Sequence, residues 1–285
     1  MARLFGLIGN RADLAGRVLL SEAEVLKAKA GGTQLGWGVG FYQGGEVLMR
    51  RRPIDDRPVI DVARLTGDVR ADLMIGHVRS ATVGSLRTEN THPFRYRQWL
   101  FEMTGTLPAF ESIRERLLAS VPEFLRSSIR GETDAEILFY VFLSFVHDAG
   151  RLNEAIMAPA HVRDALRSCL AVVDGMAAEV GGEPSKVNLM ASDGETLFAV
   201  HCGAEMGYRT YAGKSDADAL IGEDVGLRRK TPELSQMHFT LVAGDFEDDQ
   251  SLTSSTPGAL ARWHAIPERA IVTIERGLEP QIEDL

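Results

Sequence analysis

The sequence predicts an α+β domain with more than one sheet, because strand-like segments come in two groups separated by a helical centre. The first group lies before residue 104, and the second begins near residue 187. Between them, apolar residues recur at helical spacing. No internal repeat or low-complexity linker interrupts the chain, so residues 1–285 are expected to form a single domain.

In the first group, residues 2–9 form a continuous apolar run that is typical of a strand covered on both faces. Residues 14–30 have helical spacing, with Ser21 and Glu24 as a capping box. The next two strands, 37–42 and 46–50, are expected to pair as a hairpin through Gln43-Gly44-Gly45. Further strands are predicted at residues 72–78 and 99–103.

The centre predicts a helical layer, since helices are expected at residues 108–125, 134–147 and 153–173. The second of these is apolar almost all round, so either a helical layer or a partner subunit should cover it. Strands return at residues 187–192, 196–201, 239–243 and 270–275.

Composition excludes several classes of protein. The chain has 285 residues, 45% hydrophobic and 25% charged, which fits an ordered globular protein. A net charge of -9 argues against general binding of nucleic acid or anionic membranes. No apolar run is long enough to span a bilayer, and a cytoplasmic setting is expected.

The cysteines and histidines predict neither a disulfide framework nor a metal site. Cys169 and Cys202 are too few for either and are expected to be buried, inert thiols. The seven histidines show no metal-ligand spacing, and no cofactor is expected. His77 is expected to be a satisfied core residue, and His92 to fix the loop that it precedes.

The residues best suited to ligand chemistry are Arg79 and Asp134. Arg79 follows a predicted strand, and a guanidinium group matches a carboxylate in a bidentate way. Asp134 opens a predicted helix and could pair with an ammonium group. Together they would suit an α-amino acid, although chemistry alone favours structural ion pairs or helix caps. The run Arg50-Arg51-Arg52 is expected to be a solvated strand end rather than a phosphate site.

Seven short motifs stand in the order in which they occur in class II glutamine amidotransferases, a family of N-terminal-nucleophile hydrolases. The chain resembles the stand-alone bacterial branch of that family over most of its length. The matching segments are residues 1–6, 36–40, 76–82, 90–94, 104–105, 131–136 and 188–194. The resemblance implies a four-layer αββα sandwich, in agreement with the order of strands and helices.

The resemblance also implies a set of site residues. In the family, a cysteine that follows the initiator methionine attacks the side-chain amide of glutamine, with its own α-amine as the base. An asparagine side chain and a glycine N–H group stabilise the oxyanion. Carried over to this sequence, Arg79 and Thr82 would hold the α-carboxylate and Asp134 the α-ammonium group, while Gly105 would contact the side-chain carbonyl.

The chain departs from the family at both groups that make and break bonds. Ala2 stands at the nucleophile position, and its methyl group cannot attack a carbonyl. Thr104 stands where the family has the oxyanion asparagine. Gly244-Asp245-Phe246 also replaces a Ser-Glu-Pro-like turn, Leu35 replaces an aspartate, and His201 stands where an arginine often ends the strand.

Three hypotheses follow. The first is a catalytically inactive member that binds glutamine or a γ-glutamyl compound, or that serves as a non-catalytic subunit of a partner enzyme. The second is an active amidase whose nucleophile is unrecognised, with Thr104 and Cys202 as candidates, or whose native form carries cysteine at position 2. The third is a purely structural module for assembly with another subunit or with itself.

Overall fold

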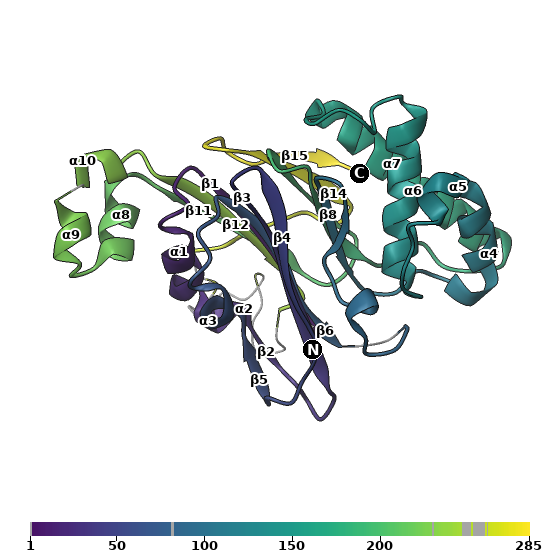
Figure 1. Ribbon diagram of the computed structural model, residues 1–285, viewed down its shortest axis with the longest axis horizontal. Helices are drawn as coiled ribbons and strands as arrows, with labels where there is room; N and C mark the ends of the chain where they lie inside the picture. The colour runs from purple at the N-terminus through teal and green to yellow at the C-terminus, as the bar shows by residue number, and fades with distance from the viewer. Residues whose placement is uncertain (1, 81–82, 230, 247–251, 253–259, 261) are drawn as a thin grey trace.

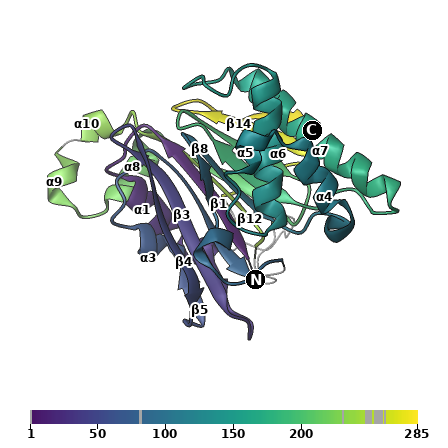
Figure 2. The same cartoon turned by 45° about the vertical axis from the view of Figure 1, so that its right-hand side comes forward.

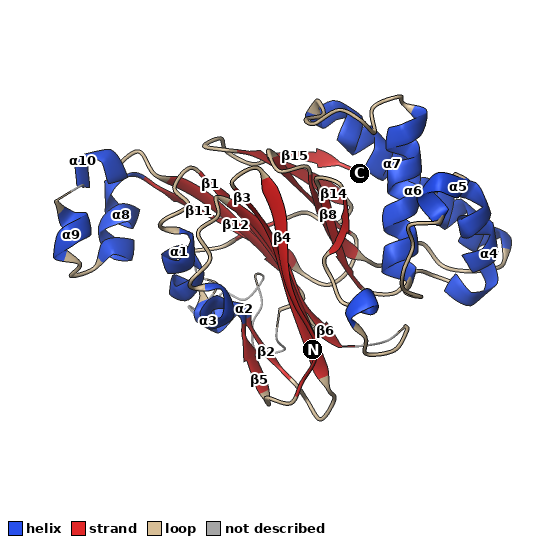
Figure 3. Cartoon of the chain, in the orientation of Figure 1, coloured by secondary structure: helices blue, strands red, loops and turns tan. Residues whose placement is uncertain are grey.

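Two stacked sheets lie between two layers of helices in the computed structural model, which describes residues 2–80, 83–229, 231–246, 252, 260 and 262–285 (Figure 1). Helices α4 to α7 cover one side of the stack and α1 to α3 the other, with α8 to α10 beyond them (Figures 1 and 3). The view turned by 45° shows the same order of layers (Figure 2). The expected four-layer αββα sandwich is therefore confirmed.

The seven-stranded sheet has β1 near its centre. Its strand order is β13-β11-β12-β1-β6-β3-β4, and all of these pairs are antiparallel. The strands are β1 (Arg3–Gly9), β3 (Leu35–Gln43), β4 (Glu46–Asp55), β6 (Leu73–Ser80), β11 (Met206–Ala212), β12 (His238–Gly244) and β13 (His264–Ala265).

The six-stranded sheet is also antiparallel and has the order β15-β14-β10-β9-β8-β7. Its strands are β7 (Phe94–Tyr96), β8 (Trp99–Thr104), β9 (Asn188–Ser192), β10 (Thr196–His201), β14 (Ala270–Glu275) and β15 (Gln281–Asp284). A separate pair joins β2 (Lys27–Lys29) to β5 (Val59–Asp61).

The longest helices cover the six-stranded sheet. They are α4 (Phe110–Ser120), α6 (Asp134–Asp148) and α7 (Pro159–Glu179), with the short α5 (Glu123–Arg126). The remaining helices are α1 (Ala15–Ser21), α2 (Ala23–Leu26), α3 (Val62–Thr66), α8 (Gly213–Ile221), α9 (Val225–Arg228), α10 (Thr231–Leu234) and the 3-10 turn η1 (Thr88–Asn90).

Strand alternation separates the buried apolar side chains into three clusters. Along β1, Leu4 and Ile8 face the other sheet, whereas Phe5 and Leu7 pack toward the helices on the outer side. The largest cluster packs α4, α6 and α7 onto the outer face of the six-stranded sheet. Helix α6 is therefore buried within a helical layer of the chain's own, as its all-round apolar sequence requires.

The hairpin and the late strands agree with the sequence predictions. β3 and β4 pair through the turn at Gly44 and Gly45, whose φ angles of 63° and 82° suit glycine. β10 and β14 have the expected bounds, and β9 and β12 differ by one residue at their ends. The weakly patterned strands β2, β5, β7, β11, β13 and β15 were not predicted.

The single helix predicted at residues 14–30 is wrong. The chain forms α1 and α2 and then leaves the helix at Lys27 to pair with β5. The expected capping box is absent, because Glu22 is the N-cap of α2 and Ser21 donates to the Val18 carbonyl within α1. Glu22 is instead buried and accepts hydrogen bonds from Arg209, Tyr211 and Trp263, a tertiary network that local spacing does not reveal.

Two other predicted helices have different limits. Residues 108–125 are divided into α4 and α5 around Val121 and Pro122, since the residue before a proline is disfavoured in the helical conformation. The helix expected at residues 153–173 begins later, at Pro159, and continues to Glu179. Proline at a first helical turn has no N–H group to leave unsatisfied, so Pro159 suits the start of α7.

We expect Gly38→Ala to lower the free energy of unfolding by about 1–3 kcal/mol. A Cβ atom at Gly38 would lie 2.0 Å from the backbone oxygen of His92, so the segment that carries His92 would have to move. The matched control is Gly175→Ala on the exposed face of α7, where nothing lies within 4 Å of the added atom. That change should stabilise the helix by about 0.5–1 kcal/mol. Urea unfolding of both variants gives the comparison, and equal effects would contradict the packing described.

A second prediction concerns Glu102, which is fully buried on β8. Burial raises the pKa of its carboxyl well above the usual range, and the backbone amide of Gly76 opposes this only in part. A carboxyl with a raised pKa in the folded state stabilises the fold at low pH, and this contribution is lost as the pH rises.

Glu102→Gln should therefore become more stable relative to the parent protein as the pH rises from 5 to 8, by at most about 1.4 kcal/mol for each pH unit. The buried histidines change the stability with pH in the opposite direction. They are present in both proteins, so their effect cancels in the stability difference between variant and parent. Urea unfolding at both pH values measures it, and a stability difference that does not change with pH would contradict this burial.

Candidate functional site

A cavity of about 280 Å³ opens where β1, β6, β8 and α6 meet. Its lining includes five of the six residues expected at the site, namely Ala2, Arg79, Thr104, Gly105 and Asp134. The sixth, Thr82, lies outside the described residues. The register explains this convergence: Arg3 pairs with Val78, so Ala2 and Arg79 lie at the same end of neighbouring strands. β8 ends at Thr104 in the facing sheet, and α6 begins with Asp134.

Arg79 is almost completely buried and holds the loop that follows β6. Its guanidinium group donates to the carbonyl oxygens of Val83 at 2.5 Å and of Gly84 and Ser85 at 3.2 Å. Burial lowers the pKa of Arg79, and the charge of Asp134 opposes that shift. Arginine remains charged in proteins, so the cavity contains a fixed positive group.

Asp134 supplies the opposite charge at the first turn of α6. Thr133 caps this helix by accepting from the Glu136 N–H group, and Asp134 accepts from the backbone N–H of Leu107 at 2.9 Å and of Ala135 at 3.0 Å. Burial raises the pKa of Asp134, and the backbone hydrogen bonds and Arg79 oppose the shift.

Arg79 and Asp134 line the same cavity without touching. Among the described residues, no ion pair within 4.0 Å joins them, although each affects the pKa of the other. Of the structural alternative, an ion pair between the two is not found among these residues, whereas Asp134 does accept from backbone N–H groups at the start of α6, as a capping residue would. Opposite charges that face one cavity across a gap can receive a zwitterion, with its carboxylate toward Arg79 and its ammonium group toward Asp134.

Thr104 is hydrogen-bonded to a residue that the sequence motifs did not place in the site. Its hydroxyl donates to Oδ2 of Asp245 at 2.5 Å. Asp245 follows β12 with a φ of 59°, and burial raises the pKa of its carboxyl, opposed by Thr104 and by the charge of Arg3. Asp245 is therefore a candidate base beside Thr104. Both residues differ from those of the family at the same positions, and this shared difference was the sequence signal that could have predicted their contact.

Gly105 continues the chain from Thr104 into the cavity wall with a φ of 90°. A Cβ atom there would lie 2.5 Å from the carbonyl oxygen of Lys186. Both the backbone conformation and the close approach of Lys186 therefore require glycine at this position.

Two buried histidines complete the inner wall. The rings of His77 and His92 lie 4.3 Å apart at an edge-to-face angle, and both residues line the cavity. Burial lowers the pKa of His77 to about 3 and that of His92 well below its usual value, so both rings are neutral near pH 7. His77 is buried as expected, but its ring nitrogens have no hydrogen-bond partner among the described residues, so it is not a satisfied core histidine.

The cysteines lie outside the cavity lining. Cys169 and Cys202 belong to the cluster between the six-stranded sheet and its helices, as expected of buried thiols. Burial raises the pKa of Cys202 to about 11 and that of Cys169 further. The thiolate is the reactive form, so neither residue has the character of a nucleophile near pH 7.

The described part of the chain contains no group of three histidine, cysteine or acidic side chains placed to hold a metal ion. Within the same residues, no helix is both long enough and apolar enough to cross a membrane.

Solved structures with the same fold include a class II glutamine aminotransferase domain protein from Silicibacter pomeroyi. The TM-score is 0.60 at 19% identity, with 99% of this chain and 98% of that chain covered. The glutamine phosphoribosylpyrophosphate amidotransferase of Bacillus subtilis has a TM-score of 0.54 at 13% identity, over 99% of this chain and 49% of that one. At these identities the likeness shows the fold alone.

Sequence relatives extend the comparison. An uncharacterized protein of Methanocaldococcus jannaschii is 24% identical over 255 residues, which cover 85% of this chain but only 61% of that protein. A protein of Escherichia coli K12 that is named for the glutamine amidotransferases is 24% identical over 235 residues, 77% of this chain and 81% of that one. The sequence model of the class II glutamine amidotransferases matches residues 1–278, and the chain therefore belongs to this family.

Proposed function

We propose that this family member binds glutamine or a γ-glutamyl compound and leaves the side-chain amide intact. The observation that carries the proposal is the composition of the cavity wall. Arg79 and Asp134, which match the two charges of an α-amino acid, share the cavity with Ala2, which has no reactive side-chain atom. The binding groups of the family motifs are thus present, and the bond-making group is missing.

The ligand's α-carboxylate would bind Arg79 alongside the loop carbonyls. A guanidinium group has five N–H donors, and those of Arg79 make three contacts with Val83, Gly84 and Ser85. Among the described residues these contacts use three of the five donors, so the others are available to a carboxylate, and the loop contacts hold the guanidinium group in place before the ligand arrives. Asp134 would accept from the α-ammonium group, and the side-chain amide would extend toward Ala2 and Gly105.

Asp245 gives a second argument against amide cleavage. Oxyanion stabilisation requires hydrogen-bond donors that point at the developing charge. Where the family has an asparagine amide, Thr104 has a hydroxyl whose proton is donated to Asp245. The carboxyl group of Asp245 occupies that hydroxyl proton, and in its ionised form it disfavours negative charge on the other side of Thr104. Loss of one such donor typically costs a factor of about 100–1000 in rate, and loss of a nucleophile costs about a million-fold.

The Thr104–Asp245 contact also favours one alternative, an active amidase. Asp245 could accept the proton of the Thr104 hydroxyl while that oxygen attacks an amide carbonyl. Ammonia would then appear from glutamine, and Thr104→Val would abolish its release. A role as a non-catalytic partner subunit remains compatible with ligand binding, whereas a purely structural module needs no ligand.

Calorimetric titration with L-glutamine tests binding. We expect saturable heat without ammonia release, and an affinity at least about ten-fold lower for Asp134→Asn, because the charge-assisted hydrogen bond to the ammonium group is lost. Asp148→Asn is the matched control, since Asp148 is exposed at the opposite end of α6. Equal binding by Asp134→Asn, or no heat at millimolar glutamine, would contradict the proposed site.

Restoration of the missing groups tests the reason for inactivity. Ala2→Cys alone should release ammonia only slowly, because the oxyanion position still lacks its amide donor. The triple variant Ala2→Cys, Thr104→Asn, Asp245→Asn should exceed the single variant by at least about 100-fold. Asparagine retains the shape of Asp245 and tolerates its positive φ.

Mass spectrometry must first show that methionine is removed from both cysteine variants. Full activity of the single variant would refute the role given to Thr104 and Asp245.

A further inference from the structure

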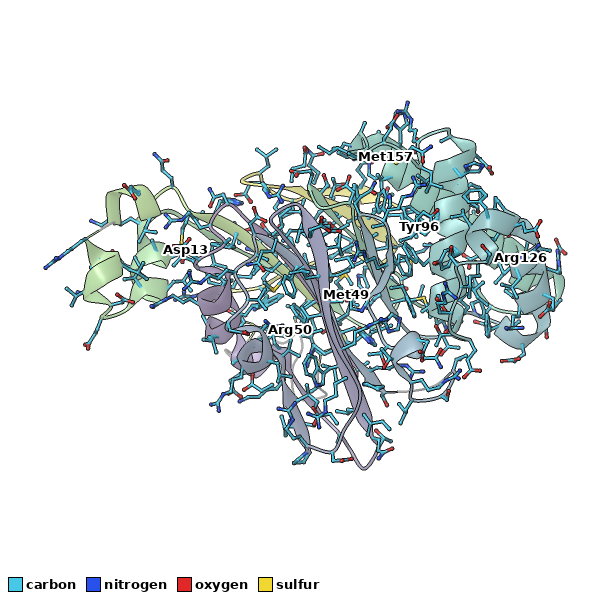
Figure 4. All side chains as sticks on the ribbon, viewed as in Figure 1. Asp13, Met49, Arg50, Tyr96, Arg126 and Met157 are labelled. Carbon is cyan, nitrogen blue, oxygen red and sulfur yellow. The ribbon has the colours of Figure 1, made fainter. Side chains whose placement is uncertain are left out.

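A second cavity, of about 290 Å³, lies between the edge strand β4 of one sheet, the edge strand β7 of the other and the start of α6. Three arginines line it, each from a different part of the fold. Arg51 lies on β4, Arg95 on β7, and Arg130 in the segment before α6. Figure 4 labels Met49, a further lining residue, on β4 next to Arg50.

None of these three arginines forms an ion pair within 4.0 Å in the described part of the chain. Arg51 donates to the carbonyl oxygen of Thr91 at 3.3 Å, and Arg95 donates to those of Val47 at 2.9 Å and Arg97 at 3.0 Å. Only the backbone N–H of Arg130 has a hydrogen bond there, to Glu136. Among the described residues, the positive charges of these guanidinium groups are therefore not paired with carboxylates, and some of their N–H donors have no acceptor.

The neighbours of Arg51 on β4 behave differently. Arg50 pairs with Asp68 at 2.8 Å, and Arg52 lies 3.7 Å from a carboxylate oxygen of Asp55. Both side chains are exposed on the opposite face of the strand, whereas Arg51 is half-buried. Burial lowers the pKa of Arg51, with Glu89 and Glu136 opposing. The expected solvated strand end is therefore wrong in two respects: the run lies within β4 and not at its end, and strand alternation turns Arg51 away from the exposed face.

Two carboxylates also line the cavity, and they do not neutralise it. Glu136 uses both oxygens to accept from the backbone N–H groups of Arg130 at 2.9 Å and Gly131 at 2.6 Å. Burial raises the pKa of Glu136, and the hydrogen bonds from the backbone of Arg130 and Gly131 oppose the shift. Glu89 is exposed at the rim. Three positive groups against two negative ones leave the cavity electropositive in a chain whose net charge is -9.

We propose that this second cavity binds a phosphate group, presented by a small phosphorylated molecule. A planar carboxylate is satisfied by a single bidentate arginine, whereas a tetrahedral phosphate accepts from several directions at once. Arginines from three separate elements that line one cavity offer donors to such an anion from different sides. The hydroxyl groups of Thr88 and Ser128 line the same cavity and add neutral donors.

The phosphate site shares a wall with the amino-acid cavity. His92 lines the first cavity and Phe94 the second, and their rings are in edge-to-face contact at 4.7 Å. Asp134 and Glu136, in the same first turn of α6, face the first and second cavities respectively. A molecule held at the phosphate site would thus lie beside a bound amino acid, although the site requires no amino acid to form.

Titration with inorganic phosphate, followed by ³¹P NMR at constant ionic strength, tests the site. We expect saturable binding that becomes at least about ten-fold weaker in Arg130→Gln and in Arg51→Gln. Arg52→Gln is the matched control on the same strand and should bind like the parent protein. Glu89→Gln removes a negative charge from the rim and should tighten binding. Circular dichroism establishes that each variant is folded.

The pattern across these variants distinguishes a built phosphate site from diffuse attraction to surface arginines. Loss confined to Arg51→Gln and Arg130→Gln, with a gain in Glu89→Gln, supports the site. No saturable binding at about 10 mM phosphate, or equal weakening in Arg52→Gln, overturns it. Acetate that binds as tightly as phosphate under the same conditions overturns the assignment to phosphate. Because Arg130 and Arg51 do not line the amino-acid cavity, these results are independent of glutamine binding.

Discussion

The face-to-face packing of two antiparallel sheets determines where each functional side chain lies. β1 and β6 are neighbours in one sheet, and their register brings Ala2 and Arg79 to the same edge. β8 in the facing sheet ends at that edge with Thr104, and α6 begins beside it with Asp134. Because the inter-sheet space is filled by apolar side chains from both sheets, these ends cannot shift independently. The strand ends that line the cavity are therefore held in place by the core, and the segments that follow them complete its wall.

The same cavity combines retained binding groups with altered reactive groups. Arg79 and Asp134 carry opposite charges, and hydrogen bonds to backbone groups hold the two side chains apart. This arrangement suits a zwitterionic ligand. Ala2 has no nucleophilic side-chain atom. Asp245 accepts the hydrogen bond of the Thr104 hydroxyl, which replaces the oxyanion donor. These changes reinforce one another, since a carboxylate would oppose the oxyanion even if a nucleophile were present. The proposed role therefore depends on binding, with chemistry absent or supplied by another polypeptide.

Sequence reasoning succeeded where a local pattern and the tertiary fold agree. The hairpin turn requires positive φ angles, and the sequence places glycine at Gly44 and Gly45. Helix α6 is buried on all sides, and its sequence is apolar almost all round. It failed where distant residues decide, as at Glu22, whose partners are about 190 or more residues away. The site shows the same division: Arg79 and Asp134 stand in motifs, whereas the Thr104–Asp245 contact joins positions 141 residues apart.

The central claim is that glutamine binds and that its side-chain amide is not cleaved. A crystal structure of the protein with L-glutamine tests this claim most directly. We predict an intact glutamine, with its α-carboxylate on Arg79, its α-ammonium group on Asp134 and its side-chain amide beside Ala2 and Gly105. The loop carbonyls should keep their contacts with Arg79. Glutamate in place of glutamine, or an acyl group joined to the Thr104 oxygen, would contradict this prediction and establish catalysis. A cavity without the amino acid at saturating glutamine would contradict it as well and leave assembly as the role of the fold.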